Sequence, residues 1–231
     1  MKCKLLVSAL LFAPFAFGQS YKKIHKKAIV VDTHNDVLMR AADIGTVLDE
    51  NNIGKAHTDL KRFKEGGLDV QLFSVYTDGD KKNAYAYAMR QMDSLDAVVA
   101  RNPEKIRKVF TTAELRAALK QGMIAAMFGV EGGHMIENDL TKIDSLFHRG
   151  ARYLTLTHNI APEWATSAAD ETSTKKILPH KGLTDFGKQV VKRMNELGML
   201  VDVSHAGDQT FWDVIALTSK PIIASHSSVY A

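Results

Sequence analysis

Short apolar runs alternate with longer amphipathic stretches along most of the chain. Six of these runs are rich in Val, Ile, Leu, Phe or Tyr and have the length of a β-strand. Several lack the polar–apolar alternation of a half-buried strand, which is typical of strands covered on both faces in a parallel sheet. The predicted strands are residues 29–32, 69–76, 124–130, 153–157, 200–203 and 222–224.

The stretches between these runs carry the signals of helices. Thr111 and Glu114 form the pattern of a capping box that opens a short helix. Apolar residues recur at helical spacing after Thr184, and Gly198 is placed to end that helix. The predicted helices are residues 84–100, 111–120, 140–148, 184–198 and 208–217.

The repeated strand–helix order predicts a parallel sheet with helices outside it. Six strands are visible, and the chain stops at Ala231 soon after the sixth. A closed barrel needs eight strand–helix units and about 250 residues. We therefore expect an α/β fold, a (β/α)8 TIM-like barrel that is C-terminally truncated after about the sixth strand. The alternative, an open doubly wound sheet, lacks a Gly-rich phosphate-binding fingerprint after its first strand. Residues 161–180 are predicted to be a long polar loop of the kind that covers a site.

Residues 1–18 are predicted to be a signal peptide that is not part of the fold. Two lysines precede an apolar run over residues 5–17, and residues 16–18 form a small-residue cleavage site. The run is short for a membrane span. The expectation is a secreted or periplasmic protein whose barrel domain comprises residues 19–231, with no stable membrane insertion after cleavage.

Composition narrows the chemistry in two ways. Cys3 is the only cysteine and lies within the predicted signal, so disulfides and thiolate metal sites are excluded from the mature chain. The formal charge of +4 owes much to four lysines between positions 22 and 27, and no stripe of Lys or Arg is interleaved with aromatic residues. We therefore expect no nucleic-acid partner.

Histidines and acidic residues gather at the ends of the predicted strands. The C-terminal strand ends of a (β/α) barrel converge on one mouth, so residues far apart in sequence meet there. Taken singly, each of them has an ordinary interpretation as a solvated acid or a hydrogen-bonded rim histidine. The residues at these ends are His34, Asp36, Glu131, His158, His205 and His226.

Taken together, these residues predict a metal site. Five of them are the ligand candidates, namely His34, Asp36, Glu131, His205 and His226. Three histidines and two carboxylates suit Zn²⁺, and five ligands exceed what one tetrahedral zinc with an open position would take. Two metal ions that share a carboxylate bridge would use them all. His34 and Asp36 leave an extended segment on the same side. Glu131 directly follows an apolar strand, is central in the strand order and is the predicted bridge. His57 and His134 are not predicted as ligands.

Five segments in this order resemble the membrane (renal) dipeptidase family, peptidase family M19. Each segment is a weak signal by itself, whereas the ordered set, which runs from about residue 29 to the end of the chain, is specific. The segments are VDTHND at 31–36, VEGGH at 130–134, RYLTLTHN at 152–159, DVSH at 202–205 and SHSS at 225–228.

The resemblance implies a metal-dependent hydrolase barrel and a division of the ligands between two zinc ions. His34 and Asp36 would hold one ion, His205 and His226 would hold the other, and Glu131 would bridge the two. These five residues are the expected metal ligands.

The resemblance also implies an activity. His158 would contact the substrate and stabilise the tetrahedral intermediate rather than bind metal. Family members cleave dipeptides, often with a D-residue at the C-terminal position, so the expected function is a zinc-dependent dipeptidase that uses a hydroxide bridging two metals. An arginine shortly after the last histidine and an aspartate at the eighth strand have no counterpart before Ala231.

Two other interpretations stay open. Another metal-dependent barrel amidohydrolase, such as a lactonase or a deaminase, would commonly open with two histidines and bridge with a modified lysine, where this chain has His34, Asp36 and Glu131. The second is an inactive fragment, or a metal-binding protein without turnover. A homodimer is compatible with the sequence.

Overall fold

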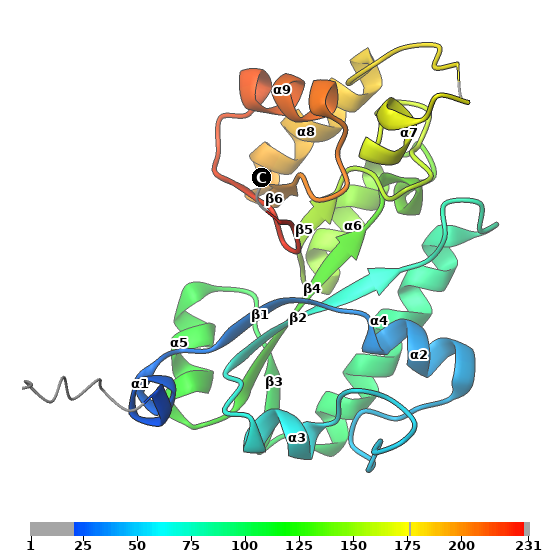
Figure 1. Ribbon diagram of the computed structural model, residues 1–231. Helices are drawn as coiled ribbons and strands as arrows, with labels where there is room; N and C mark the ends of the chain where they lie inside the picture. Colours follow the sequence, from blue (N-terminus) through cyan, green and yellow to red (C-terminus); the bar gives the residue numbers. More distant parts are fainter. Residues whose placement is uncertain (1–20, 176, 229–231) are drawn as a thin grey trace, which may run out of the picture.

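The computed structural model describes residues 21–175 and 177–228. These residues form a curved sheet of seven strands in the order β1-β2-β4-β5-β6-β7, and β3 pairs with the first part of β4 (Figure 1). Every strand pair is parallel. The strands are β1 (Val31–Asn35), β2 (Val70–Tyr76), β3 (Ile106–Lys108), β4 (Ile124–Glu131), β5 (Ala151–Thr155), β6 (Leu200–Asp202) and β7 (Ile222–Ile223).

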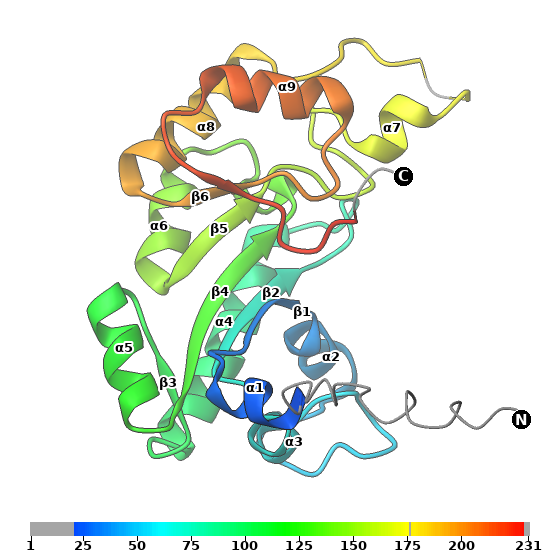
Figure 2. The same ribbon diagram turned by 60° about the vertical axis from the view of Figure 1, so that its left-hand side comes forward.

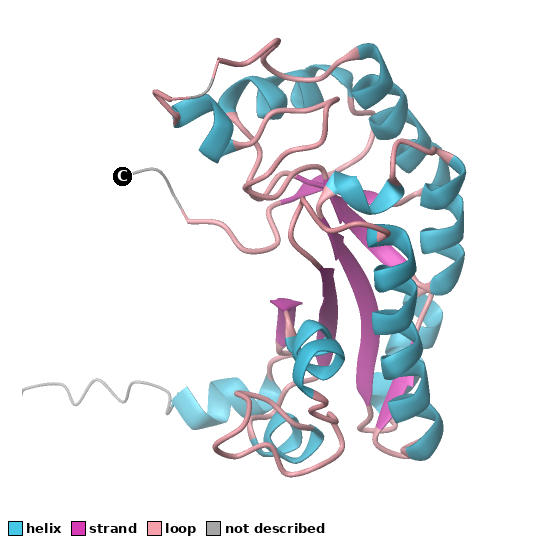
Figure 3. Cartoon of the chain, turned by 90° about the vertical axis from the view of Figure 1, so that its right-hand side faces the viewer, coloured by secondary structure: helices cyan, strands magenta, loops and turns pink. Residues whose placement is uncertain are grey.

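The helices lie largely on the convex side of this sheet (Figure 3). α4, α6 and α8 pack against β2, β5 and β6. This arrangement confirms the predicted α/β class and the parallel barrel architecture. The helices are α1 (Tyr21–Lys27), α2 (Val37–Ile44), α3 (Leu60–Glu65), α4 (Ala84–Arg101), α5 (Thr112–Lys120), the 3-10 helix η1 (Gly133–Ile136), α6 (Thr141–Arg149), α7 (Ala168–Thr172), α8 (Asp185–Leu197) and α9 (Asp208–Leu217).

Local capping signals in the sequence correctly placed three helix ends. The Thr111 side chain accepts a hydrogen bond from the Glu114 backbone, and the Glu114 carboxylate accepts one from Thr111, which is the predicted capping box of α5. Thr184 caps α8, and Gly198 ends it with φ at 75°, a left-handed conformation that glycine adopts without a Cβ clash.

Several short elements were not predicted. β3 has three residues, two of them basic, and its pairing with β4 is what defines it. α2 and α3, the two helices between β1 and β2, are too short to show a long repeat of apolar residues at helical spacing. The predicted loop at residues 161–180 contains α7, whose N-cap Ser167 accepts a bond from the Asp170 backbone. Tertiary contacts stabilise such elements, because helices this short are unstable by themselves.

The carboxyl ends of the strands face a common mouth, and one hydrogen bond joins the two ends of the sheet order there. Thr33 in β1 donates through its hydroxyl to the Ser225 carbonyl, just after β7, at 2.5 Å. The blue and red segments therefore approach each other in Figure 2 although they are 192 residues apart. This contact brings the first and last strand ends to one site.

The predicted signal peptide lies at the N-terminal end of the chain. Residues 1–18, the predicted signal peptide, lie outside the described residues, and their assignment stays a prediction, as does the location derived from it. Across residues 21–175 and 177–228, no helix is long and apolar enough to cross a membrane.

Candidate metal centre

All six predicted site residues lie at the mouth of the sheet. Glu131 is the last residue of β4, as predicted. His158, His205 and His226 each lie three residues beyond a strand end, after β5, β6 and β7 respectively. His34 lies inside β1 rather than after it, because the strand continues to Asn35.

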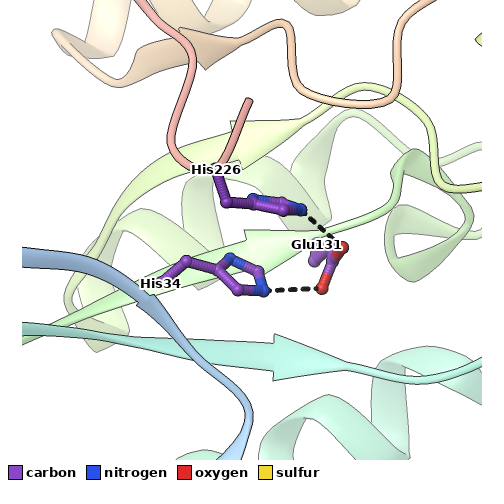
Figure 4. Close-up of side chains that lie close together, drawn as sticks. All are labelled: His34, Glu131 and His226. Atoms are coloured by element: carbon purple, nitrogen blue, oxygen red, sulfur yellow. Dashed lines mark ion pairs between the residues drawn. The ribbon is translucent and has the colours of Figure 1, made fainter. Parts of the chain in front are cut away.

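Glu131 lies at the centre of this group. Its carboxylate is nearly inaccessible, with a side-chain exposure of 4%. One oxygen, Oε2, lies 3.2 Å from His34 Nε2 and accepts a hydrogen bond from the Ser74 hydroxyl at 3.2 Å. The other, Oε1, lies 3.1 Å from His205 Nε2 and 3.4 Å from His226 Nε2. The two oxygens thus face different imidazoles, and Figure 4 shows this for His34 and His226.

The donor atoms have spacings that suit metal ions. A zinc with bonds of about 2.0–2.1 Å in tetrahedral geometry holds its ligand atoms about 3.3 Å apart. His205 Nε2 and His226 Nε2 are 2.9 Å apart, and each is within 3.4 Å of Glu131 Oε1. His34 Nε2 is 3.3 Å from Asp36 Oδ1 and 3.2 Å from Glu131 Oε2. These spacings are those of ligand atoms around a metal ion. By distance alone, the described residues offer two groups of potential metal ligands, one of His34, Glu131 and His226 and one of Glu131, His158 and His205.

Asp36 contacts His34 through a backbone conformation that the sequence did not predict. Its φ and ψ of −84° and 17° are not extended, because it stands at the N-cap position of α2. Its Oδ1 is buried and accepts no hydrogen bond within the described part of the chain. A buried carboxylate oxygen without a hydrogen-bond donor is costly, and a cation there would relieve that cost.

The His34 ring is oriented by a tyrosine that crosses the sheet. Tyr153, in β5, donates to the Thr33 carbonyl at 3.0 Å, so its oxygen faces His34 Nδ1, 3.2 Å away, as an acceptor. Nδ1 then carries the proton, and the Nε2 lone pair is directed at the ligand position. Gly129 makes this possible, since a Cβ there would lie 1.9 Å from the Tyr153 ring.

The His226 ring is oriented in the same way by a buried serine and aspartate. Ser225 Oγ donates to Asp202 Oδ2 at 2.6 Å and lies 2.8 Å from His226 Nδ1, from which it accepts. Asp202 also accepts from the Thr155 hydroxyl at 2.6 Å and from the Ser204 hydroxyl at 2.9 Å. This network, which spans β5, β6 and the segment after β7, leaves His226 Nε2 free to bind a metal ion.

His205 is held in an uncommon backbone conformation. Its φ of 60° lies in the left-handed region, which non-glycine residues seldom adopt. Its carbonyl accepts a hydrogen bond from the Ala168 backbone N–H at 2.8 Å, at the start of α7. The 161–180 segment therefore helps to hold this histidine at the site.

His158 is farther from Glu131 than the other rings are. Its Nε2 lies 3.8 Å from Glu131 Oε1, and its Nδ1 lies 3.4 Å from the Tyr76 hydroxyl. Tyr76 donates to Asp78 at 2.7 Å. Burial lowers the pKa of His158, so the ring is mainly neutral at neutral pH. By distance alone, His158 could join Glu131 and His205 around one metal ion.

The electrostatics of the metal-free site follow from burying one carboxylate among imidazoles. Burial raises the pKa of Glu131, but hydrogen bonds from His205, His226 and His34 outweigh it and hold this pKa well below its usual range. Burial lowers the pKa of His34, but the adjacent carboxylates of Asp36 and Glu131 outweigh that effect and raise the pKa to about 10. The pocket thus stabilises positive charge beside Glu131, whether that charge is a proton or a metal ion.

The family model of membrane dipeptidases (peptidase family M19) matches residues 19–231. The chain belongs to the membrane dipeptidase family. An uncharacterised dipeptidase of Schizosaccharomyces pombe is 34% identical to this dipeptidase-family chain, and the alignment covers 92% of this chain. That alignment covers 55% of the yeast protein, so the chain spans about half the length of this relative.

Two solved structures share the fold. A metallopeptidase from Rhodobacter sphaeroides, liganded with a phosphinate mimic of the dipeptide L-Ala-D-Ala, superimposes with a TM-score of 0.74. It is 23% identical, and the match covers 86% of this chain and 65% of that one. A probable dipeptidase from Pseudomonas aeruginosa gives a TM-score of 0.78 at 23% identity, covering 89% of this chain and 54% of the other.

Sequence reasoning assigned no role to the residues that orient the ligands in this member of the dipeptidase family. Asp202 and Ser225 lie in the quoted family segments, and a fully buried Asp at the end of an apolar strand is a signal of an internal network. Tyr153 and Tyr76 resemble ordinary strand residues, because only the sheet register places their hydroxyls at the site. His57 and His134 belong to neither group of potential metal ligands among the described residues.

Replacing Ser225 with alanine is expected to weaken metal binding about 10–100-fold, because His226 Nδ1 loses the acceptor that sets its tautomer. A competition titration with a coloured chelator measures this affinity. Ser227→Ala, two positions along the chain and exposed, is the matched control and should bind normally. Unchanged affinity in the Ser225 variant would contradict the orienting role.

The stability of the metal-free protein is expected to fall between about pH 7 and pH 10. The pKa of His34 is raised from 6.5 to about 10 on folding, so its protonation stabilises the fold fully below pH 6.5. That contribution is lost as the pH rises toward 10. Glu131 acts in the opposite direction, since its lowered pKa contributes stability above about pH 4.5 that is lost on acidification.

Urea unfolding of the chelator-treated chain at several pH values measures this dependence. His34→Gln lacks the titrating ring and should show a flatter profile over the same interval. A free energy of unfolding that is constant or rises between pH 7 and pH 10 would contradict the charged state assigned to His34.

Proposed function

We propose that the protein is a zinc-dependent dipeptidase that holds two metal ions bridged by Glu131. The observation that carries the proposal is the position of the Glu131 carboxylate, whose two oxygens face separate groups of ligand atoms. One ion would be held by His34 and Asp36, and the other by His205 and His226. The structure with the phosphinate mimic of L-Ala-D-Ala supports a dipeptide as the substrate class.

The metal ions, when bound, would polarise the scissile carbonyl and supply a hydroxide between them, since coordination lowers the pKa of water to about 7. The residues of this chain would orient the metal ligands and supply the negative charge between the two metal positions. Tyr153 and Ser225 orient two of the ligand rings. The Glu131 carboxylate keeps the negative charge that both metal positions need, because its pKa is held low.

His158 would bind the substrate and donate to its developing oxyanion. It lies beside the proposed ligands, and its Nε2 is 3.8 Å from Glu131 Oε1, farther than the Nε2 atoms of the three ligand histidines. Nε2 carries a proton when the Tyr76 hydroxyl turns from Asp78 to donate to Nδ1. A hydrogen-bond donor directed at the oxygen on which charge develops would stabilise the transition state, and the turn of the Tyr76 hydroxyl is the one rearrangement that it requires.

The test is zinc per chain by elemental analysis, with Ala-Ala hydrolysis assayed on the same sample of the protein expressed from its full reading frame. Close to two zinc ions per chain and hydrolysis that a chelator abolishes are expected. Bound metal without dipeptide hydrolysis would favour another barrel amidohydrolase, which a panel of lactones and deaminase substrates would then identify. A folded protein without bound metal would overturn the proposal.

A further inference from the structure

A cavity of about 540 Å³ opens beside the proposed metal ligand Asp36. One wall is the end of β1 and the first turns of α2, and the other is the loop that leads to α3. These segments lie next to each other in Figure 1. The residues that line it are Asn35, Asp36, Val37, Met39, Arg40, Lys55, Ala56, His57 and Thr58.

The part of this cavity that lies away from Asp36 is lined by positively charged side chains. Arg40 and Lys55 are exposed cations, and neither side chain has a hydrogen bond or ion pair within residues 21–175 and 177–228. His57 adds an exposed imidazole that is also without such a partner in this part of the chain. Asp36 is the one acidic residue of the lining, and it already faces His34 at 3.3 Å. Unbalanced cations around a concave surface favour an anionic ligand.

The loop that carries Lys55 and His57 is held at both ends by buried polar groups. The Asn52 side chain donates to the Val47 carbonyl at 3.0 Å and to the Thr58 carbonyl at 3.2 Å. Asp59 is 2% exposed, and its Oδ2 accepts from the Asn52 backbone at 3.2 Å.

Arg62 holds the middle of the same loop. Its Nη2 donates to the Ala56 carbonyl at 2.9 Å, and its Nε donates to Asp59 Oδ2 at 2.8 Å. The cations are therefore presented by a preorganised loop, which reduces the entropy that binding would cost.

We propose that this cavity receives a carboxylate side chain of the substrate, so that acidic dipeptides are the preferred substrate class. The proposal rests on the dipeptidase function proposed above. A dipeptide bound at the metal centre lies next to Asp36, and the cavity extends from Asp36 toward Arg40 and Lys55. Guanidinium and ammonium groups bind carboxylates through charge-assisted hydrogen bonds. The volume lies within the range of small-molecule sites, about 300–1,000 Å³.

Isosteric acid and amide substrates test the proposal. The measured quantity is the ratio of kcat/KM for Glu-Ala over Gln-Ala, and for Ala-Glu over Ala-Gln, on the metal-loaded full chain. At least one ratio is expected to be about tenfold or more, because the amide keeps the size and removes the charge. The double variant Arg40→Met, Lys55→Met should bring that ratio close to one, and Lys55→Glu should lower it.

Lys61→Met is the matched control. Lys61 is an exposed lysine of α3 whose partner is Glu65, it does not line the cavity, and its loss should leave the ratio unchanged. Equal kcat/KM values for acid and amide in the unmodified protein, or a preference that survives the double variant, would overturn the proposal.

A binding measurement separates this proposal from the dipeptidase function. Calorimetry with the chelator-treated chain gives the affinities for Glu-Ala, Gln-Ala, Ala-Glu and Ala-Gln without turnover. Tighter binding of an acid than of its amide, lost in the double variant, would support the cavity even if no dipeptide were hydrolysed. Equal binding of the acids and the amides would overturn the cavity proposal while leaving Ala-Ala hydrolysis to decide the function.

Discussion

Replacing Glu131 with alanine is expected to remove both bound metal ions and dipeptide hydrolysis together. The carboxylate faces His34 with one oxygen and His205 and His226 with the other, so no neighbouring group can take over either contact. Loss of the metal ions removes several kcal/mol of transition-state stabilisation, which corresponds to a fall in kcat/KM on the order of 10³-fold or more. Zinc analysis and Ala-Ala kinetics on one sample measure both effects.

Glu131→Gln keeps the side-chain volume and separates metal loss from misfolding. The amide cannot bridge two cations, so this variant should also lose metal while its circular dichroism spectrum stays normal. Glu196→Gln, an exposed glutamate on α8, serves as the control and should keep both zinc and activity. A Glu131 variant that retains two zinc ions per chain would show that the bridge is assigned to the wrong residue.

Replacing His158 with alanine is expected to lower kcat by about 10²–10³-fold while zinc content stays normal. The loss of one oxyanion donor costs about 2.7–4 kcal/mol. Of the four histidine Nε2 atoms near Glu131, that of His158 is the most distant, at 3.8 Å from Oε1, and its Nδ1 is next to Tyr76. Elemental analysis and steady-state kinetics together distinguish a donor from a ligand.

The control is His148→Ala, which removes an exposed histidine of α6 and should leave kcat unchanged. Loss of zinc in the His158 variant would mean that His158 joins Glu131 and His205 as a ligand, the alternative that the distances also permit. Unchanged kcat with normal zinc would remove His158 from the chemistry.

Much of the fold could be predicted because its signals are local. The strand β4 is an apolar run whose length alone identifies it, and α8 begins and ends at residues with strong capping preferences. β3 and α7 could not be predicted, because two of the three residues of β3 are basic and the five residues of α7 show no apolar pattern, so both depend on their partners in the fold. The same limit applies to Asp36, whose backbone turns into α2 instead of continuing the strand.

The sequence by itself determined which residues make up the candidate site. Glu131 ends an apolar strand, His158, His205 and His226 follow such strands, and the strand ends must converge in a parallel barrel. His34 lies within β1 and belongs to the same mouth. Only the tertiary structure decided how these residues are used. The direction of each Glu131 oxygen depends on the sheet register and the curvature of the mouth. The tautomer of His34 depends on Tyr153, which reaches it from β5. The tautomer of His226 depends on its neighbour Ser225, whose hydroxyl is oriented by Asp202 at the end of β6. The Tyr153–His34 contact joins residues 119 positions apart, and the Asp202–Ser225 contact joins residues 23 positions apart on different strand ends, so no local pattern in the sequence encodes either of them.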